Sequence, residues 1–183
     1  MAKSYCDLAD AHPAHRYHHD VEHGRMPADD AGLLERLAWE INQAGLSWLT
    51  ILKKRDSLHV AYAGFDPTRV AAFDAGDIER LLADPGVIRH RGKIEALIHN
   101  AEVFVGFAAT HGSAKAWFDA QAGRDLPSWV RLFRKTFRFT GPEIVREFLE
   151  GVGYLPGAHA TWCPLHAQII GDEAPWRQLP DQE

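Results

Sequence analysis

The chain has 183 residues, a formal net charge of −5 and a hydrophobic content of 46%. This length fits one domain, and the apolar content is sufficient for a hydrophobic core. The negative balance excludes nucleic-acid binding through overall charge, so such binding would need a local basic face. No apolar run is long enough to span a bilayer and no signal-peptide core is apparent, so we expect a soluble, cytoplasmic protein without a membrane partner.

The pattern of helix caps and turn residues predicts a single helical domain over residues 1–183. Residues 1–27 are expected to be irregular because they contain two prolines, many histidines and little periodicity. Helices are expected over residues 31–43, 46–56, 67–73, 77–83, 91–109, 113–122, 127–135 and 142–151, with one further turn at 59–63. Residues 166–183 are expected to form a loosely ordered tail. No strand or repeat is apparent, so the predicted fold class is all-α.

The stretch from Glu40 to Arg55, EINQAGLSWLTILKKR, combines polar and aromatic groups in apolar company. At helical spacing one face would carry Glu40, Gln43, Ala44, Ser47, Trp48 and Ile51. A carboxylate, an amide, a hydroxyl and an indole would then lie together. Gly45 costs a helix about 1 kcal/mol relative to alanine, which indicates a break or a close approach to the backbone. The alternative is a buried helix whose polar groups satisfy one another.

Cysteine and histidine pairs occur near both ends of the chain. Cys6 precedes His19 with twelve residues between them, and His159 precedes Cys163 with three. Two thiolates and two imidazoles suit a tetrahedral, structural zinc site without an open position. The spacing does not choose between His18 and His19, and chance occurrence of these residues is the alternative to a metal site.

The segment LLADPGVIRHRGKI predicts two helices joined by a tight Pro-Gly turn. In a helix-hairpin-helix, backbone N–H groups of the turn and the next helix amino terminus face a DNA phosphate. The candidate DNA contacts are Gly86, Val87, Arg89, Arg91 and Lys93. The alternative is an ordinary corner between two helices with solvated charges.

Taken together, these motifs resemble the DNA-3-methyladenine glycosylase I family of base-excision repair enzymes. The resemblance lies in QAGLSWLTILKKR (43–55), FDPTRVA (65–71) and VIRHRGKIEALIHNA (87–101), and in the Cys/His pairs at the two ends. It extends over about residues 5–163. It implies an all-α helix-hairpin-helix domain in which structural Zn²⁺ joins segments 1–27 and 154–165.

The resemblance also implies roles for individual residues. It favours His19 over His18 as a ligand, and the implied zinc ligands are Cys6, His19, His159 and Cys163. Glu40 is the implied pocket glutamate and Trp48 the ring that stacks on the base. The implied partner is double-stranded DNA containing alkylated bases, and the implied enzyme is a monomeric, monofunctional glycosylase without a lysine nucleophile.

The chain departs from the family pattern at several pocket positions. The tyrosine that usually precedes the ligand histidine is His18 here, and another pocket aromatic is replaced by His15. The tryptophan of the family's D-x-E-W-G motif is His23. A helix of small and aromatic residues near the carboxyl end contains Arg146 and Glu147 instead.

A 3-alkylated adenine is cationic and already a good leaving group, so its excision needs modest help. Trp48 offers a π-face worth about 0.5–2 kcal/mol to a cation, and Glu40 offers a negative acceptor. We expect Ser47, His15 and His18 to contact the base as well. If these histidines became protonated, they would repel it, and activity would fall below about pH 6.5. Two other functions remain open: a DNA-binding module of the same fold without excision, and a zinc hydrolase with an open coordination position.

Overall fold

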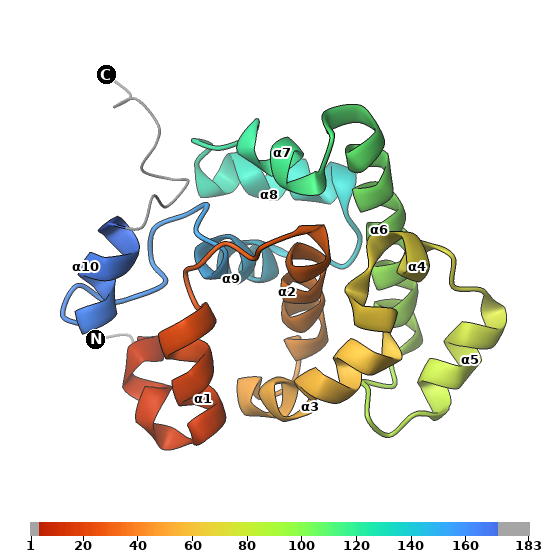
Figure 1. The fold of residues 1–183 in the computed structure, drawn as a ribbon, viewed down its shortest axis with the longest axis horizontal. Helices are drawn as coiled ribbons and strands as arrows, with labels where there is room; N and C mark the ends of the chain where they lie inside the picture. Colours follow the sequence, from red (N-terminus) through yellow and green to blue (C-terminus); the bar gives the residue numbers. More distant parts are fainter. Residues whose placement is uncertain (1–3, 172–183) are drawn as a thin grey trace.

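The computed structural model describes residues 4–171, and these residues form helices joined by turns, with no strand among them (Figure 1). This confirms the predicted all-α class. The helices in chain order are η1 (Tyr5–Ala11), α1 (Pro13–Tyr17), η2 (His18–Glu22), α2 (Asp30–Gln43), α3 (Trp48–Ala61), η3 (Ala63–Phe65), α4 (Pro67–Ala71), α5 (Ala75–Ala83), α6 (Arg91–His111), α7 (Ala114–Asp119), α8 (Leu126–Thr136), α9 (Pro142–Gly151) and α10 (Pro164–Gly171).

Helix α2 lies at the centre of the molecule, with α3, α6 and α9 packed around it (Figure 1). Its apolar residues at three- and four-residue spacing, including Leu33, Leu37 and Ile41, are fully buried. The side chain of Asp29 caps the helix by accepting a hydrogen bond from the Gly32 amide at 2.9 Å. A helix surrounded in this way contributes many of its side chains to the core.

The chain breaks between α2 and α3, as Gly45 indicates. Gly45 has φ +82°, a left-handed conformation that glycine adopts without steric cost. Ser47 then caps α3 and accepts a hydrogen bond from the Thr50 amide at 3.2 Å. A continuous helical face from Glu40 to Trp48 is therefore wrong, and the two residues approach each other by a change of chain direction.

The expectation that residues 1–27 are irregular is wrong, because most of this segment is helical. Ser4 and Asp7 form a reciprocal capping box at the start of η1. Pro13 occupies the first turn of α1, where a missing N–H is tolerated. Helix α1 runs directly into the π-helical turn η2, which buries His18 and His19. Local caps thus supply the order that hydrophobic periodicity does not reveal.

The carboxyl-terminal segment folds back onto the amino-terminal one. In Figure 1 the blue helix α10 lies beside the red helix α1, at the same side of the molecule. Helix α10 includes residues 166–171, which were expected to belong to a loose tail, and residues 172–183 of that prediction lie outside the described residues. In the part of the chain that the structure describes, no helix combines the length and apolarity needed to cross a membrane.

Lys93 joins α6 to the end of α2. Its side chain is buried, and Nζ donates hydrogen bonds to the carbonyl oxygens of Asn42 at 2.9 Å and Ala44 at 2.7 Å. A cation at a helix carboxyl terminus satisfies carbonyls that have no intrahelical donor and complements the helix dipole. The predicted DNA contact through Lys93 is therefore wrong: this ammonium group holds the turn that carries Gly45.

We expect Lys93→Met to lower the free energy of unfolding by about 2 kcal/mol, because it leaves buried carbonyl groups without a donor. Urea unfolding checks this value. Lys53→Met is the control, since Lys53 is exposed and its replacement should change stability by less than about 0.5 kcal/mol. Unchanged stability of Lys93→Met together with weaker DNA binding would instead restore the predicted phosphate contact.

Candidate active site

A pocket with a volume of about 240 Å³ lies between the amino-terminal helices and the α2–α3 break. Its size suits a flat molecule smaller than the drug-sized ligands that fill roughly 300–1,000 Å³. We call it the base pocket. Its lining residues come from five elements and their connections: Ser4, Tyr5, Leu8, His18, His23, Glu40, Gln43, Trp48 and Glu147.

Glu40 and Trp48 both line the base pocket, so the structure brings together the carboxyl group and the indole that the sequence singled out. The Trp48 indole N–H donates a hydrogen bond to the Tyr5 hydroxyl oxygen at 3.2 Å. The ring of His18 meets that of Trp48 edge-on, with 5.1 Å between centroids. These two contacts hold the plane of the Trp48 ring in one orientation.

Tyr5 is a pocket residue that sequence reasoning missed. Its ring lies edge-on to His18 and His23, with centroid separations of 5.7 and 5.0 Å. It supplies an aromatic wall in a pocket where histidines occupy positions that are aromatic in the family pattern. The available signal was its position next to Cys6, because a predicted ligand residue fixes the direction of its neighbours.

His18 is buried, and its ring lies against the cation Arg36. Nδ1 lies 2.9 Å from a Glu22 carboxylate oxygen and 3.3 Å from an Arg36 guanidinium nitrogen. Burial lowers the pKa of His18 to about 4, and the nearby Arg36 guanidinium acts in the same direction. The neutral ring is therefore favoured at physiological pH, which argues against protonation of His18 as the cause of an activity loss below about pH 6.5. The loss itself stays a prediction.

Two residues expected to contact the base lie elsewhere. His15 is buried behind Tyr5, with 3.1 Å between its Nδ1 and the Tyr5 hydroxyl oxygen, and it does not line the base pocket. Ser47 is exposed, and its hydroxyl caps α3 and bonds the Thr50 hydroxyl at 2.7 Å. The structure thus corrects both assignments: His15 positions an aromatic residue, and Ser47 ends the α2–α3 turn.

The Glu40 carboxyl group sits in an electrostatic environment that opposes its ionisation. Burial is the main cause, and together with the charge of Glu147 on α9 it raises the pKa of Glu40 to about 8. Arg36 and Arg146 oppose the increase, and Glu143 adds to it. The neutral form of the Glu40 carboxyl group is therefore favoured, and a positive charge nearby favours its ionisation.

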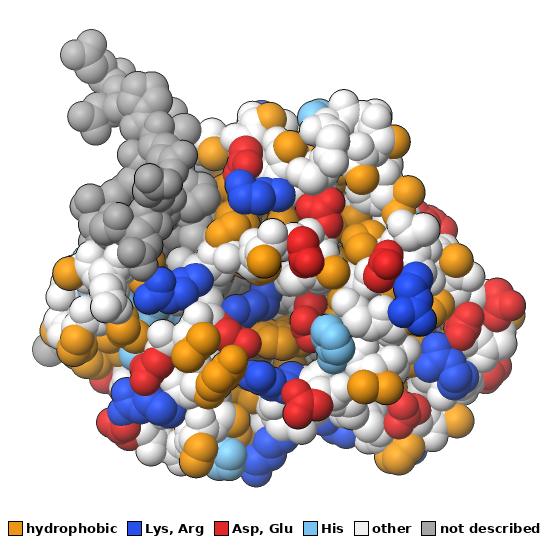
Figure 2. Space-filling model, viewed as in Figure 1, with side chains coloured by type: hydrophobic (Ala, Val, Ile, Leu, Met, Phe, Trp, Pro, Cys, Tyr) orange, Lys and Arg blue, Asp and Glu red, His pale blue; other side chains and the backbone are white. Residues whose placement is uncertain are grey.

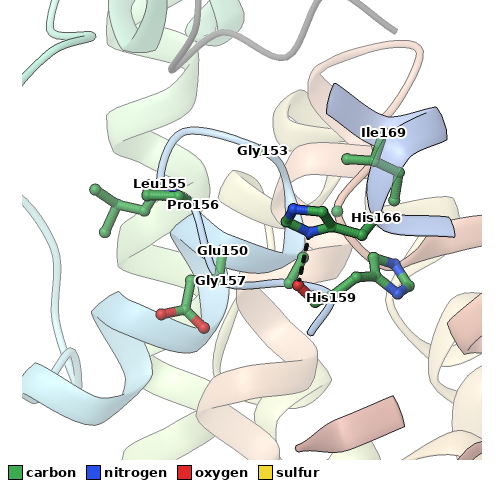
Figure 3. Close-up of a pocket in the computed structure, with 10 residues that line it drawn as sticks. Glu150, Gly153, Leu155, Pro156, Gly157, His159, His166 and Ile169 are labelled. Atoms are coloured by element: carbon green, nitrogen blue, oxygen red, sulfur yellow. Dashed lines mark hydrogen bonds between the residues drawn. The ribbon is translucent and has the colours of Figure 1, made fainter. Parts of the chain in front are cut away.

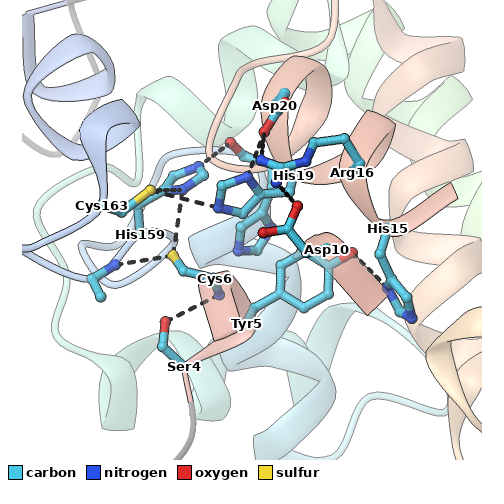
Figure 4. A network of polar contacts seen from close by, with 12 residues as sticks. Ser4, Tyr5, Cys6, Asp10, His15, Arg16, His19, Asp20, His159 and Cys163 are labelled. Atoms are coloured by element: carbon cyan, nitrogen blue, oxygen red, sulfur yellow. Dashed lines mark hydrogen bonds and ion pairs between the residues drawn. The ribbon is translucent and has the colours of Figure 1, made fainter. Parts of the chain in front are cut away.

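The Cys6, His19, His159 and Cys163 side chains converge on one another (Figure 4). All four are buried, and their ligand atoms lie within 4.8 Å of one another. Sulfur and nitrogen atoms are separated by 3.7 Å for Cys6 and His159, and by 3.6 Å for Cys163 and His19. The set that the sequence predicted is thus assembled, with His19 rather than His18 as its member from η2.

Hydrogen bonds from neighbouring groups fix the ring nitrogens that face the two sulfurs. His19 Nδ1 lies 2.7 Å from an Asp20 carboxylate oxygen, which leaves Nε2 for the cluster. His159 Nε2 donates to the His23 carbonyl at 3.0 Å, which leaves Nδ1 for the cluster. Such outer partners commonly orient metal-ligating histidines, so the donor set fits a metal ion.

A small cavity of about 50 Å³ lies on the other side of His159, between α9 and α10 (Figure 3). His166 on α10 bonds the His159 carbonyl oxygen through Nδ1 at 3.0 Å. Gly157 has φ +132°, and a Cβ atom there would lie 2.8 Å from the Glu150 carboxyl carbon. The loop that carries His159 is therefore held tightly on both sides.

Helices α5 and α6 form the expected hairpin around Gly86. A Cβ atom at Gly86 would meet Asp84 Oδ1 at 2.9 Å and Ser57 Cβ at 3.0 Å, which explains the glycine. Val87 is buried under the turn, whereas Arg89 and Arg91 are exposed. Arg91 pairs with Glu79 at 2.5 Å, so part of its charge is already compensated.

Comparison with known proteins places this arrangement in a family. Residues 8–127 match the family described as methyladenine glycosylase. The chain is 44% identical over 177 residues to DNA-3-methyladenine glycosylase 1 of Escherichia coli (strain K12), covering 86% of this chain and 94% of that protein.

Solved structures of 3-methyladenine DNA glycosylase I are also similar to this chain. The structure of 3-methyladenine DNA glycosylase I from Staphylococcus aureus, described as the structural basis of 3-methyladenine recognition, matches with a TM-score of 0.79 and 31% identity. That match covers 90% of this chain and 97% of the other. A variant of 3-methyladenine DNA glycosylase I in complex with 3-methyladenine also gives a TM-score of 0.79, at 30% identity, over 87% and 96% of the two chains.

The raised pKa of Glu40 predicts a specific dependence of stability on pH. Below the unfolded-state pKa near 4.5, both states are protonated and the contribution is fully present. It is lost as pH rises towards 8, because the unfolded state ionises first. Glu40→Gln should remove this loss of stability. The free energy of unfolding of the variant should equal that of the wild type at pH 4.5 and exceed it by about 1–3 kcal/mol at pH 8.5.

Denaturant unfolding between pH 4.5 and 8.5 measures this difference. Glu102→Gln is the control, because Glu102 is exposed on α6 and does not line the base pocket. Parallel stability curves for the wild type and Glu40→Gln would show that Glu40 ionises normally.

Proposed function

The chain belongs to the methyladenine glycosylase family, and we propose that its base pocket holds a flipped 3-methyladenine between the Trp48 ring and the Glu40 carboxyl group. The protein is a DNA glycosylase that hydrolyses the N-glycosidic bond of 3-methyladenine in DNA. The observation that supports the residue roles is the presence of an indole and a poised carboxyl group in one pocket of suitable size.

The alkylated base must leave the DNA stack to reach this pocket, at a cost of a few kcal/mol that is smaller for a damaged base. In the pocket the cation meets the π-face of Trp48, whose orientation Tyr5 and His18 fix. The arriving charge lowers the pKa of Glu40, and the carboxylate that forms accepts a hydrogen bond from the base or stabilises its charge. Binding therefore favours the alkylated base over neutral adenine.

The leaving base is already activated by its charge, so water can attack the sugar carbon with limited assistance. No covalent lysine intermediate is needed, and Lys93 is occupied with the end of α2. Glu40 lies where it can also orient the water. The chain's own contribution is to bind the cation, exclude bulk water and hold this carboxyl group in place.

DNA is the macromolecular partner, and we propose that the α5–α6 hairpin contacts its phosphate backbone as a helix-hairpin-helix. The amides of Arg91 and Gly92, in the first turn of α6, have no intrahelical acceptor and can donate to a phosphate. Arg89 adds an exposed positive charge beside them. One chain supplies the pocket, the hairpin and the Cys/His cluster, which supports a monomer acting on double-stranded DNA with alkylated bases.

We further propose that Cys6, His19, His159 and Cys163 bind one structural Zn²⁺. Ideal tetrahedral bonds of about 2.3 Å to sulfur and about 2.1 Å to nitrogen give a sulfur–nitrogen separation of about 3.6 Å. The three sulfur–nitrogen separations that we measure, 3.6 to 3.7 Å, agree with that value. Four protein ligands leave no position for a catalytic water, so the ion would act by joining the two ends of the chain.

The zinc proposal predicts one Zn²⁺ per purified chain, measured by elemental analysis. Cys163→Ser should lose the ion and lower the midpoint of thermal unfolding, because structural zinc contributes on the order of 10 kcal/mol in zinc-finger peptides. His111→Asn is the control, since this histidine is exposed on α6 and does not belong to the ligand set. The assignment would be contradicted by a wild-type protein that contains no metal and is as stable as the same protein supplied with Zn²⁺.

The excision proposal is tested by incubating the protein with methylated duplex DNA and identifying the released bases. Glu40→Gln should lower kcat/KM for 3-methyladenine by about 10- to 100-fold, the value of one charged hydrogen bond. Trp48→Ala should lower it by about 2- to 30-fold through loss of the cation–π contact. Wild-type protein that binds DNA but releases no base would support a binding module instead.

A further inference from the structure

Glu147, on α9, is a second carboxyl group of the base pocket. Besides that pocket, it lines an adjoining cavity of about 400 Å³ on the side of Gly45 and Gly141. Three residues line both spaces: Glu40, Gln43 and Glu147. Two acidic groups from different helices, α2 and α9, therefore lie where the two spaces meet.

The negative charge of Glu147 is not cancelled by its partner on α9. Arg146 donates a hydrogen bond to Glu147 at 2.5 Å, but also to Glu143 at 2.6 Å and to Glu150 at 3.2 Å. One guanidinium group thus faces three carboxyl groups. The Glu147 side chain keeps 36% of its surface accessible, so it can meet a ligand that enters the pocket.

Glu147 also acts on Glu40 across the pocket. Its charge is the largest contribution, after burial, to the raised pKa of Glu40. Like charges in one site oppose each other's ionisation, and a cation placed between them removes that repulsion. A neutral base of the same shape does not remove it.

We propose that Glu147 is a specificity-determining residue that, together with Glu40, makes the base pocket select purines carrying a positive charge. The proposal rests on the base-excision function proposed above and extends it to a helix where the family pattern has small and aromatic residues. Two carboxyl groups then contribute to selection by charge. Trp48 recognises the flat shape of the ring and also its charge.

The test compares two probes of similar shape, added to the whole protein at pH 7.5. One is the N3,N9-dimethyladeninium ion, which carries the permanent charge of the alkylated base in DNA, and the other is neutral 3-methyladenine. Calorimetry gives the dissociation constant of each probe. The constant of neutral 3-methyladenine divided by that of the cation measures the selectivity for charge. We expect Glu147→Gln to reduce this ratio about tenfold, the equivalent of one pKa unit. Glu147→Asp, which keeps the charge, should retain most of it.

Glu150→Gln is the matched control, because Glu150 lies one turn later on α9, shares Arg146 and does not line the base pocket. It should leave the ratio unchanged. An unchanged ratio in Glu147→Gln, or an equal loss of affinity for both probes, overturns the proposal. Base release from methylated DNA by the wild type is measured separately, so a failure of the excision function is distinguishable from a failure of the Glu147 assignment.

Discussion

The packing of the amino-terminal helices against the loop at residues 159–163 is the constraint on which the base pocket depends. This loop meets Cys6 on η1 and His19 on η2, more than 140 residues away in the sequence. The same two helical segments carry Tyr5 and His18, which form the wall facing Trp48. Without that packing, α2 and α3 would present Glu40 and Trp48 on an open surface, where water would weaken every electrostatic interaction with a base.

In the function that we propose, burial of the pocket lets a carboxyl group distinguish bases by charge. In water, a glutamate with a normal pKa carries its charge all the time and interacts weakly with a cation. In the pocket, burial and Glu147 keep Glu40 largely neutral until a positive charge enters. The cost of ionising Glu40 is therefore offset only by a cationic ligand, and neutral adenine, the overwhelmingly common alternative in DNA, does not provide that compensation.

The sequence predicts the parts of this structure that depend on local chemistry. Asp29, Asp66 and Asp74 mark helix starts through their short polar side chains, and Gly45 marks the break at which φ becomes positive. These features depend on a residue and its immediate neighbours.

Features that depend on the approach of distant segments could not be read from local patterns. Helical spacing placed Ser47 beside Glu40, but the chain reverses at Gly45 and turns the hydroxyl to a cap. Tyr5 lines the base pocket in place of His15, which lies behind it, and neither η1 nor α1 has a strong hydrophobic period that would predict this. Of the positions that the family pattern indicated, Glu40, Trp48 and His18 line the pocket and His15 does not, and the pattern did not indicate Tyr5.

The basic residues show how a chain with a negative charge balance can still bind DNA. Lys93 is used inside the molecule, Lys54 donates to the Pro85 carbonyl in the hairpin turn, and Arg91 is paired with Glu79. On the face seen in Figure 2, Lys and Arg side chains are interspersed with Asp and Glu rather than gathered in one patch. Positive charge in the hairpin therefore serves largely to hold its geometry. In the DNA contact that we propose, phosphate recognition falls to the oriented amides at the start of α6 and to the exposed Arg89, which require a correctly shaped backbone more than a large positive potential.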